Sequence, residues 1–427
     1  MKRRILLRKG MALLSVAVFT AELWGCGTEE KSEEKKTLRV VTEETFYHSV
    51  KDAAEFTEGT NSEIQVEIQA LVTDKAKREA EIQKLRTEIM AGKGPDVFLM
   101  DSIPENAIRE GGFLMENPYK TMQSGALASL DIYMEKDAYW KDSSYNEVFL
   151  KAGQYDGRQY IIPMSVSYYV LPRPKDMEEM TGDTLGEWLE QIRASDDIRL
   201  KQMLYTFTSH SARWMQPAVN YETKEVLFEK EKWMGFLEEH YQFEKETYKD
   251  VVGKEKFQYF EATKNTLFKK NASQLDMQVV PDINGKKMAT IMSYGAVARS
   301  SDLKKEAYDF LMLFLNDQTE QYSKKHADDS ATGLPSLLGY LDGINMPVQE
   351  SAFWQWADFP SEEMLQEMRK TFRELDGAYF LTEGDRALND AVMTVLGSMR
   401  NPDDDMKMEI SKMADNAIAT YKILVSE

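Results

Sequence analysis

The stretch GKGPDVFLMD, residues 92–101, joins a helix to a buried strand and decides how the chain around it folds. A helix cannot continue through Pro95, and the two glycines before it can take the left-handed conformation that ends a helix. The apolar residues 97–100 then have the composition of a strand. In open α/β sheets ligands collect at the carboxyl ends of strands, so Asp101 is a candidate ligand contact.

Upstream of this joint, strand and helix patterns alternate. Residues 37–42 (TLRVVT) and 64–70 (IQVEIQA) have strand patterns, while residues 49–58 and 74–90 place apolar side chains at helical spacing. The order strand, helix, strand, helix, strand is typical of a parallel sheet with helices packed on it. The sequence therefore predicts an α/β fold.

Downstream, turn signals separate further elements. Asp156-Gly157 indicates a hairpin turn into a strand that ends at Pro163, and residues 279–285 (VVPDING) indicate a second turn. Residues 187–270 are charged and mostly helical in pattern, whereas residues 290–298 return to strand composition. Two more helices are predicted at residues 106–114 and 303–315.

Residues 1–25 read as a secretory signal peptide. A basic start precedes the apolar run of residues 11–20, which is too short to span a bilayer as a permanent helix. The segment that follows, Leu23-Trp24-Gly25-Cys26, resembles a bacterial lipobox, although Glu22 and Trp24 depart from the pattern. That resemblance implies cleavage before Cys26 and its lipidation.

Residues 26–36 would then be the lipidated cysteine and a flexible tether, because residues 27–36 (GTEEKSEEKK) contain no apolar side chain. Cys26 is the single cysteine in the chain, so no intramolecular disulfide can form.

The overall composition narrows the class of protein. With 427 residues, of which 42% are hydrophobic, the chain is long enough for two domains with sizeable cores. The formal net charge of -19 argues against a nucleic-acid partner and against adsorption to anionic lipid. We therefore expect an exported protein whose contact with the membrane is the lipid anchor alone.

The ordered motifs resemble those of the family 1 extracellular solute-binding proteins, the maltose-binding-protein-like receptors of ABC importers. The series covers nearly the whole mature chain and runs lipobox, TLRVVT, AGKGPDVFLMD, YDGRQYIIP, VVPDING, SYGAVARSSDLKKEAYDFLMLFLND and TGLPSLL. The resemblance implies a two-lobed periplasmic-binding-protein-like fold of type II, with a ligand cleft between the lobes and hinge crossings. Residues 37–162 and 287–332 would form lobe 1, and residues 163–286 and 333–427 would form lobe 2.

The resemblance also implies where a ligand would bind. Matching positions follow the first strand, end the GPDVF strand, follow the first crossing and supply aromatic side chains: Glu43, Glu44, Tyr47, Asp101, Ser167, Tyr168, Tyr294, Trp354 and Trp356. Carboxylates and aromatic faces suit sugar hydroxyls and sugar rings. From the residues alone, the tyrosines could instead be half-buried rim residues, one tryptophan a core residue, and Asp101 the cap of a following helix.

The function implied is that of a substrate-binding lipoprotein of an ABC importer. It would capture a small solute, with a carbohydrate as the expected class, and deliver it to a membrane permease from the outer face of the bacterial cell membrane. We expect a monomer without cofactor.

Two rival functions remain. A ligand-sensing or scaffolding lipoprotein with the same fold is one, because the family's Tyr-Asn after the first crossing is replaced here by residues 170–173 (VLPR). An exported hydrolase is the other. The chain has no G-x-S-x-G or H-E-x-x-H motif, and its four histidines stand far apart. We therefore expect neither catalytic residues nor a metal site.

Overall fold

The computed structural model describes residues 35–102, 112–143, 145–205, 213–251, 260–261, 275–315, 345–349, 362–397 and 404–426. These ranges belong to one compact unit. The predicted signal peptide, Cys26, the motif at residues 332–338 and most of the helix predicted at residues 106–114 lie outside them.

The N-terminal part of this unit has the predicted alternation of strands and helices. Its elements are β1 (Lys36–Glu43), the 3-10 turn η1 (Glu44–Phe46), α1 (Tyr47–Thr60), β2 (Ile64–Leu71), α2 (Lys75–Met90) and β3 (Val97–Asp101). Strand β1 pairs in parallel with both β2 and β3, which confirms the predicted parallel arrangement. The side chain of Asp74 caps α2 by accepting a hydrogen bond from the Lys77 N–H at 3.1 Å.

The joint between α2 and β3 uses its two glycines differently. Gly92 has a φ of +67°, the left-handed conformation predicted for it. Gly94 is instead required by close packing, since a Cβ there would lie 2.6 Å from Cγ1 of Ile89. The joint is tied to β1, because the Arg39 N–H donates to the Asp96 carboxylate at 2.8 Å.

The main sheet is mixed and has seven strands. Its order is β13-β6-β12-β3-β1-β2, with β14 also paired to β12. Strand β12 (Met288–Val297) is antiparallel to both β3 and β6 (Ile161–Ser167). The short strands β13 (Met346–Pro347) and β14 (Gly377–Tyr379) bring later parts of the chain into the same sheet.

The expectation that a strand ends at Pro163 was wrong. Strand β6 runs through Pro163 to Ser167, and Pro163 is opposite Tyr294 of β12. The register between the two strands shifts between Ser293 and Tyr294, beside this pair. An irregular register accommodates a residue that has no N–H to donate to the ladder.

The predicted hairpin before β6 is confirmed. Strands β4 (Gln154–Tyr155) and β5 (Arg158–Gln159) pair in antiparallel fashion. Asp156 and Gly157 have φ values of +50° and +69°, the positive angles that two-residue hairpin loops require.

A second, three-stranded sheet lies between two hydrophobic cores. Strand β7 (Tyr169–Pro174) pairs with β10 (Phe260–Glu261) and β11 (Leu275–Val279). Val170 packs in the first core, which also contains the apolar side chains of the main sheet. Tyr169 and Leu171 pack in the second core. Because side chains alternate along a strand, β7 contributes to both cores.

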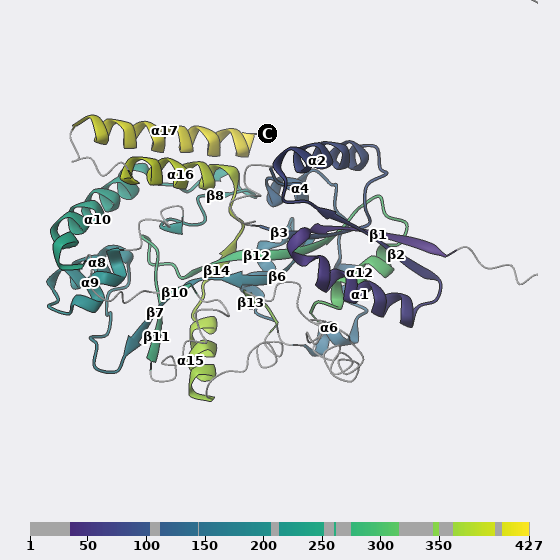
Figure 1. Cartoon of the computed structure of the whole chain (residues 1–427), viewed down its shortest axis with the longest axis horizontal. Coiled ribbons are helices and arrows are strands. Elements are labelled where there is room, and N and C mark those ends of the chain that lie inside the picture. The colour runs from purple at the N-terminus through teal and green to yellow at the C-terminus, as the bar shows by residue number, and fades with distance from the viewer. Residues whose placement is uncertain are drawn as a thin grey trace, which may run out of the picture. The chain divides into compact units, whose positions relative to one another are not determined.

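Helices build most of the second core. The region from residue 187 onward was expected to be mostly helical, yet the hairpin β8 (Val219–Asn220) and β9 (Glu225–Val226) interrupts it. Helices α16 and α17 lie side by side (Figure 1). The helices of this region are α8 (Leu185–Ala194), α9 (Ile198–Tyr205), α10 (Lys230–Val251), α16 (Glu383–Gly397) and α17 (Asp404–Ser426).

The remaining helices pack around the main sheet or connect its strands. They are α4 (Pro118–Gln123), α5 (Asp131–Met134), α6 (Ala138–Asp142), α7 (Glu147–Ala152), α12 (Lys304–Met312) and α15 (Glu362–Arg373). Among the helices that the structure describes, none is long and apolar enough to cross a membrane.

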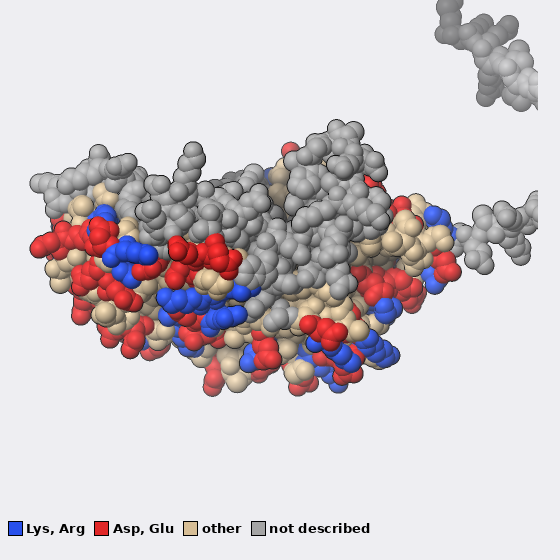
Figure 2. Space-filling model, turned by 90° about the horizontal axis from the view of Figure 1, so that it is seen from below, with Lys and Arg blue, Asp and Glu red and all other residues tan. Residues whose placement is uncertain are grey.

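Acidic and basic side chains are interspersed on the face in Figure 2, so the net negative charge is not gathered there into a single patch.

A buried carboxylate ties α16 to two distant segments. Asp385 is 2% exposed, and its Oδ1 accepts hydrogen bonds from Gln216 Nε2 at 2.9 Å and from the Tyr421 hydroxyl at 2.8 Å. Its Oδ2 accepts from both the N–H and the hydroxyl of Thr382, each at 2.8 Å. The Gln216 N–H in turn donates to Asp282 at 3.3 Å, so this network reaches the turn at residues 281–285.

Candidate functional site

Three charged side chains act electrostatically on a buried tyrosine near the ends of β1 and β3. We call Glu43, Asp101, Tyr294 and Arg386 the strand-end cluster. Glu43 and Asp101 are the last residues of two neighbouring parallel strands, and Tyr294 is opposite the residue before Asp101. Burial raises the pKa of the Tyr294 hydroxyl far above its ordinary value of 10.0; the charges of Glu43 and Asp101 raise it further, and that of Arg386 lowers it. The cluster is thus electrostatically linked at the edge of the sheet where ligands are expected.

Glu43 forms a bidentate ion pair inside the protein. Its side chain is 1% exposed, with Oε2 2.7 Å from Nη1 of Arg78 and Oε1 3.0 Å from Nη2. Nε of Arg78 also donates to the carbonyl of Gly112 at 2.9 Å. Burial raises the pKa of Glu43, whereas the hydrogen bonds and charge of Arg78 lower it. The pair fixes the end of β1 against α2.

Tyr294 begins a chain of aromatic contacts that leads away from the cluster. Its ring meets Phe380 edge to face at 5.3 Å, and Phe380 meets Tyr119 in the same way at 5.5 Å. Tyr119 then stacks on Tyr221 at 4.6 Å with the rings 14° apart. The Tyr119 hydroxyl accepts from the Phe380 N–H at 3.0 Å. This aromatic chain connects the main sheet to the hairpin β8–β9.

Arg386 was not predicted from the sequence. Its guanidinium donates to the carbonyls of Leu381 at 2.8 Å and Glu116 at 3.1 Å, and lies 4.1 Å from the ring centroid of Phe113. It therefore joins the start of α16 to the segment after β3. A sequence pattern could have pointed to it, because an arginine in the first turn of a helix lies at the end where the helix dipole disfavours cations. Such a residue is expected to have a partner outside its own helix.

Glu44 and Tyr47 lie in the short segment that follows β1. An oxygen of the Glu44 carboxylate accepts from the Thr73 N–H at 2.9 Å, which links η1 to the loop after β2. Tyr47 is 38% exposed, and its ring lies edge-on to His48 at 5.8 Å. The tyrosine therefore has surface available for a ligand.

Ser167 and Tyr168 are both buried. Tyr168 is 1% exposed and its hydroxyl bonds to Thr371 of α15 at 2.9 Å. The Ser167 hydroxyl faces the sulfur of Met292 at 3.2 Å. Because the Met292 carbonyl accepts from the Ser102 N–H at 2.8 Å, Ser167 contacts the strand beside the end of β3, whereas Tyr168 contacts α15. Trp354 and Trp356 lie outside the described residues, so their role stays a prediction.

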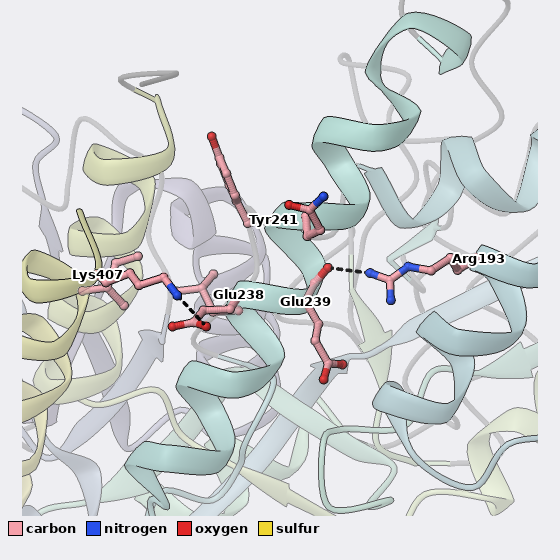
Figure 3. A pocket seen from close by; sticks show the side chains of 8 residues that line it. Arg193, Glu238, Glu239, Tyr241 and Lys407 are labelled. Atoms are coloured by element: carbon pink, nitrogen blue, oxygen red, sulfur yellow. Dashed lines mark hydrogen bonds and ion pairs between the residues drawn. The ribbon is translucent and has the colours of Figure 1, made fainter. Parts of the chain in front are cut away.

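A separate hollow of about 320 Å³ lies on the helical region, among α8, α10 and α17 (Figure 3). Its charged side chains contact neighbouring elements: Lys407 Nζ is 3.3 Å from Glu238, and Arg193 donates to the Glu239 carbonyl at 3.0 Å. Among the described residues that line this hollow, none is a predicted ligand contact. Among the described residues, no cluster of histidine, cysteine or acidic side chains could hold a metal ion.

Comparison with known proteins gives a clear result only at the level of structure. No protein-family model and no curated protein matches the sequence. The solved structure of the sugar-binding protein MalE from Xanthomonas citri matches with a TM-score of 0.59 and 14% identity, over 92% of this chain and 100% of that chain.

Two other solved structures match over similar lengths. An extracellular solute-binding protein of family 1 from Alicyclobacillus acidocaldarius has a TM-score of 0.56 and 12% identity, over 93% of this chain and 100% of its own. An ABC substrate-binding protein from Listeria monocytogenes, in complex with cycloalternan, has a TM-score of 0.53 and 17% identity, over 91% and 99%. The chain therefore has the two-lobed α/β fold of the family 1 extracellular solute-binding proteins, as its ordered motifs predicted.

Proposed function

We propose that this chain is the extracytoplasmic substrate receptor of an ABC importer and that it binds a small carbohydrate. The observation that carries this proposal is the fold match over more than nine-tenths of the chain to proteins described as sugar-binding or ABC substrate-binding. These neighbours are binding proteins rather than enzymes, which favours capture of a solute without chemical change.

The strand-end cluster and the segment after β1 supply suitable chemistry for a sugar. Asp101 is half-buried at the end of β3 and offers carboxylate oxygens to hydroxyl groups. Tyr47 offers an exposed aromatic face to the apolar side of a sugar ring. We assign Asp101 and Tyr47 as direct contacts, while Glu43 and Arg386 hold the surrounding backbone in place.

Binding would be accompanied by closure of two lobes. We propose residues 37–162 and 287–332 as lobe 1 and residues 163–286 and 333–427 as lobe 2. The division of β7 between two cores supports a crossing in this part of the chain, and the start of β7 lies a few residues after the proposed boundary at Pro163. A sugar that contacts both lobes favours the closed state by the difference in its affinity for the two states.

Anchoring and delivery complete the proposed function. A lipidated Cys26 would hold the monomer at the outer face of the cell membrane, with residues 27–36 as the tether. The closed, sugar-bound form would then be presented to the permease. No cofactor takes part in these steps.

A ligand-sensing or scaffolding role is the second candidate, and one observation favours it. Two predicted contacts, Glu43 and Tyr168, are 1% exposed and bonded to Arg78 and Thr371. If the other predicted contacts are also buried and hydrogen-bonded within the protein, the fold would act as a scaffold and would not bind a solute.

A thermal-shift screen tests the proposal. The purified protein would be heated with mono- and oligosaccharides, polyols, amino acids and polyamines, because a ligand of the folded state raises the melting temperature. We expect a rise with one saccharide class, lost in Asp101→Ala and retained in Asp302→Ala, which removes an exposed aspartate. No rise with any compound, from a protein that melts cooperatively, would favour the scaffold role.

A further inference from the structure

A groove of about 660 Å³ lies beyond the far end of the aromatic chain, and none of its described lining residues is a predicted ligand contact. Its walls come from α4, α7, the hairpin β4–β5, the hairpin β8–β9 and residues 376–378. Tyr119 and Tyr221 are part of its lining, so we call it the tyrosine groove. Its volume lies within the range of small-molecule sites, roughly 300–1,000 Å³.

Three residues that line the groove keep unused hydrogen-bonding groups. Gln123 donates from Nε2 to the Tyr221 carbonyl at 2.9 Å, which leaves its Oε1. Asn220 accepts two backbone N–H groups with Oδ1, which leaves its Nδ2. Within the part of the chain that the structure describes, neither of these atoms nor the Tyr155 hydroxyl has a hydrogen-bond partner. The lining thus offers a carbonyl oxygen, an amide N–H and a hydroxyl.

Charge and polarity indicate the kind of molecule that would fit. Among the described lining residues the ionic side chains are balanced: Lys151 and Lys286 are basic, and Glu222 and Asp376 are acidic. A groove without net charge gives no advantage to a strongly ionic ligand. The half-buried ring of Tyr155, combined with amide and hydroxyl groups, suits a neutral molecule that carries several hydroxyls.

We propose that the tyrosine groove is a second carbohydrate site, for a mono- or disaccharide, separate from the site at the strand-end cluster. The ligand class rests on the proposed function, whereas the place rests on the lining residues alone. The aromatic chain from Tyr294 to Tyr221 joins the two places, and none of the substitutions used in the test below alters it.

Isothermal titration of the purified full chain tests this proposal, with glucose, maltose, maltotriose, mannobiose and xylobiose as probes. Leu227→Trp places a large ring at the groove in place of a side chain that is 37% exposed. Its matched control is Ile132→Trp, at a position 53% exposed on α5. Tyr155→Phe removes one hydroxyl from the groove, and Tyr160→Phe is its control on the same stretch of chain. Asp101→Ala removes the strand-end site.

We expect two sites for one of these sugars. Asp101→Ala should retain one of them, and Leu227→Trp should retain the other. In Asp101→Ala, addition of Tyr155→Phe should weaken the remaining site by about five- to tenfold, as expected for the loss of one hydrogen bond. Ile132→Trp and Tyr160→Phe should leave both sites unchanged.

The other outcomes separate this inference from the proposed function. A single site that Asp101→Ala removes and Leu227→Trp leaves unchanged would overturn the second site and retain the receptor. A single site that persists in Asp101→Ala but is lost in Leu227→Trp would support the groove and contradict the strand-end assignment. No binding of any probe by the folded protein would overturn both.

Discussion

Two buried carboxylates in this molecule are satisfied in opposite ways. Glu43, at the edge of the main sheet, relies on both Nη atoms of a single cation, Arg78. Asp385, beside the second core, accepts hydrogen bonds from the neutral side chains of Gln216, Tyr421 and Thr382 and from a backbone N–H. The first arrangement concentrates the stabilisation in one side chain and the second divides it among several. Loss of one partner should therefore have unequal consequences in the two places.

The largest effect is expected for Arg78→Ala. Removal of the guanidinium leaves Glu43 buried without a counter-charge, which lowers the free energy of unfolding by about 3–5 kcal/mol. Urea unfolding measures this loss. Arg86→Ala is the control, because the Arg86 side chain is 33% exposed and its partner Glu116 is 53% exposed. It should cost less than about 1 kcal/mol. Equal losses in the two variants would contradict the role given to the buried pair.

The pH dependence of the free energy of unfolding tests the Glu43–Arg78 pair further. Burial raises the pKa of Glu43 above its ordinary value of 4.5. The folded protein therefore holds this proton more tightly than the unfolded chain, so the contribution of Glu43 to stability is present below pH 4.5 and is lost as the pH rises through the folded pKa. Arg78→Ala removes a group that lowers this pKa.

The difference in unfolding free energy between Arg78→Ala and the parent protein should consequently shrink as the pH falls from neutral toward 4.5. Urea unfolding at several pH values would show it. A difference that stays constant over this range would mean that the charge on Glu43 does not cause the destabilisation.

A smaller effect is expected for Tyr421→Phe in the second core. The change removes one hydroxyl from Oδ1 of Asp385 and leaves the Gln216 and Thr382 hydrogen bonds in place. We expect a loss of about 2 kcal/mol, typical of a hydrogen bond to a charged group. Tyr160→Phe should change stability by less than about 0.5 kcal/mol. A loss as large as that of Arg78→Ala would show that the Asp385 network is not shared among its donors.

The smallest effect is expected for Tyr221→Phe in the aromatic chain. The Tyr221 hydroxyl accepts from Asn117 Nδ2 at 3.0 Å, while the ring stacks on Tyr119. Phenylalanine keeps the stack and loses this neutral hydrogen bond, which should lower stability by about 1 kcal/mol. Tyr221→Ala would lose the stack as well and should be clearly less stable by urea unfolding. Equal values for the two variants would assign the contribution to the hydroxyl alone.

The sequence predicted those parts of the fold whose signals are local. Pro95 and the glycines before it, and Asp156-Gly157, determine backbone geometry within a few residues, and the structure has the predicted joint and hairpin there. The end of β6 was placed wrongly because Pro163 is tolerated next to an irregular register with a strand more than 120 positions away. No local pattern reports that partner.

Less of the candidate site could be predicted from the sequence, because its contacts also join residues that are far apart in the chain. Asp101 and Tyr294 could be named because they follow or lie in recognisable strands. Glu43 was placed at the right edge of the sheet, but its pairing with Arg78, 35 positions away, depends on how α2 packs. Arg386 contacts Glu116 across 270 positions. Such contacts exist only after the whole chain has folded.

Small-angle X-ray scattering with and without sugar would show whether the protein closes on its ligand. The protein would be measured alone and at saturation with the saccharide that raises its melting temperature most, and Asp101→Ala would be measured in parallel. We expect the parent protein to have a smaller radius of gyration with sugar than without it, because a ligand held between two lobes favours the closed state. The radius of gyration of Asp101→Ala should not change. A saturated parent protein with an unchanged radius of gyration would contradict capture by closure.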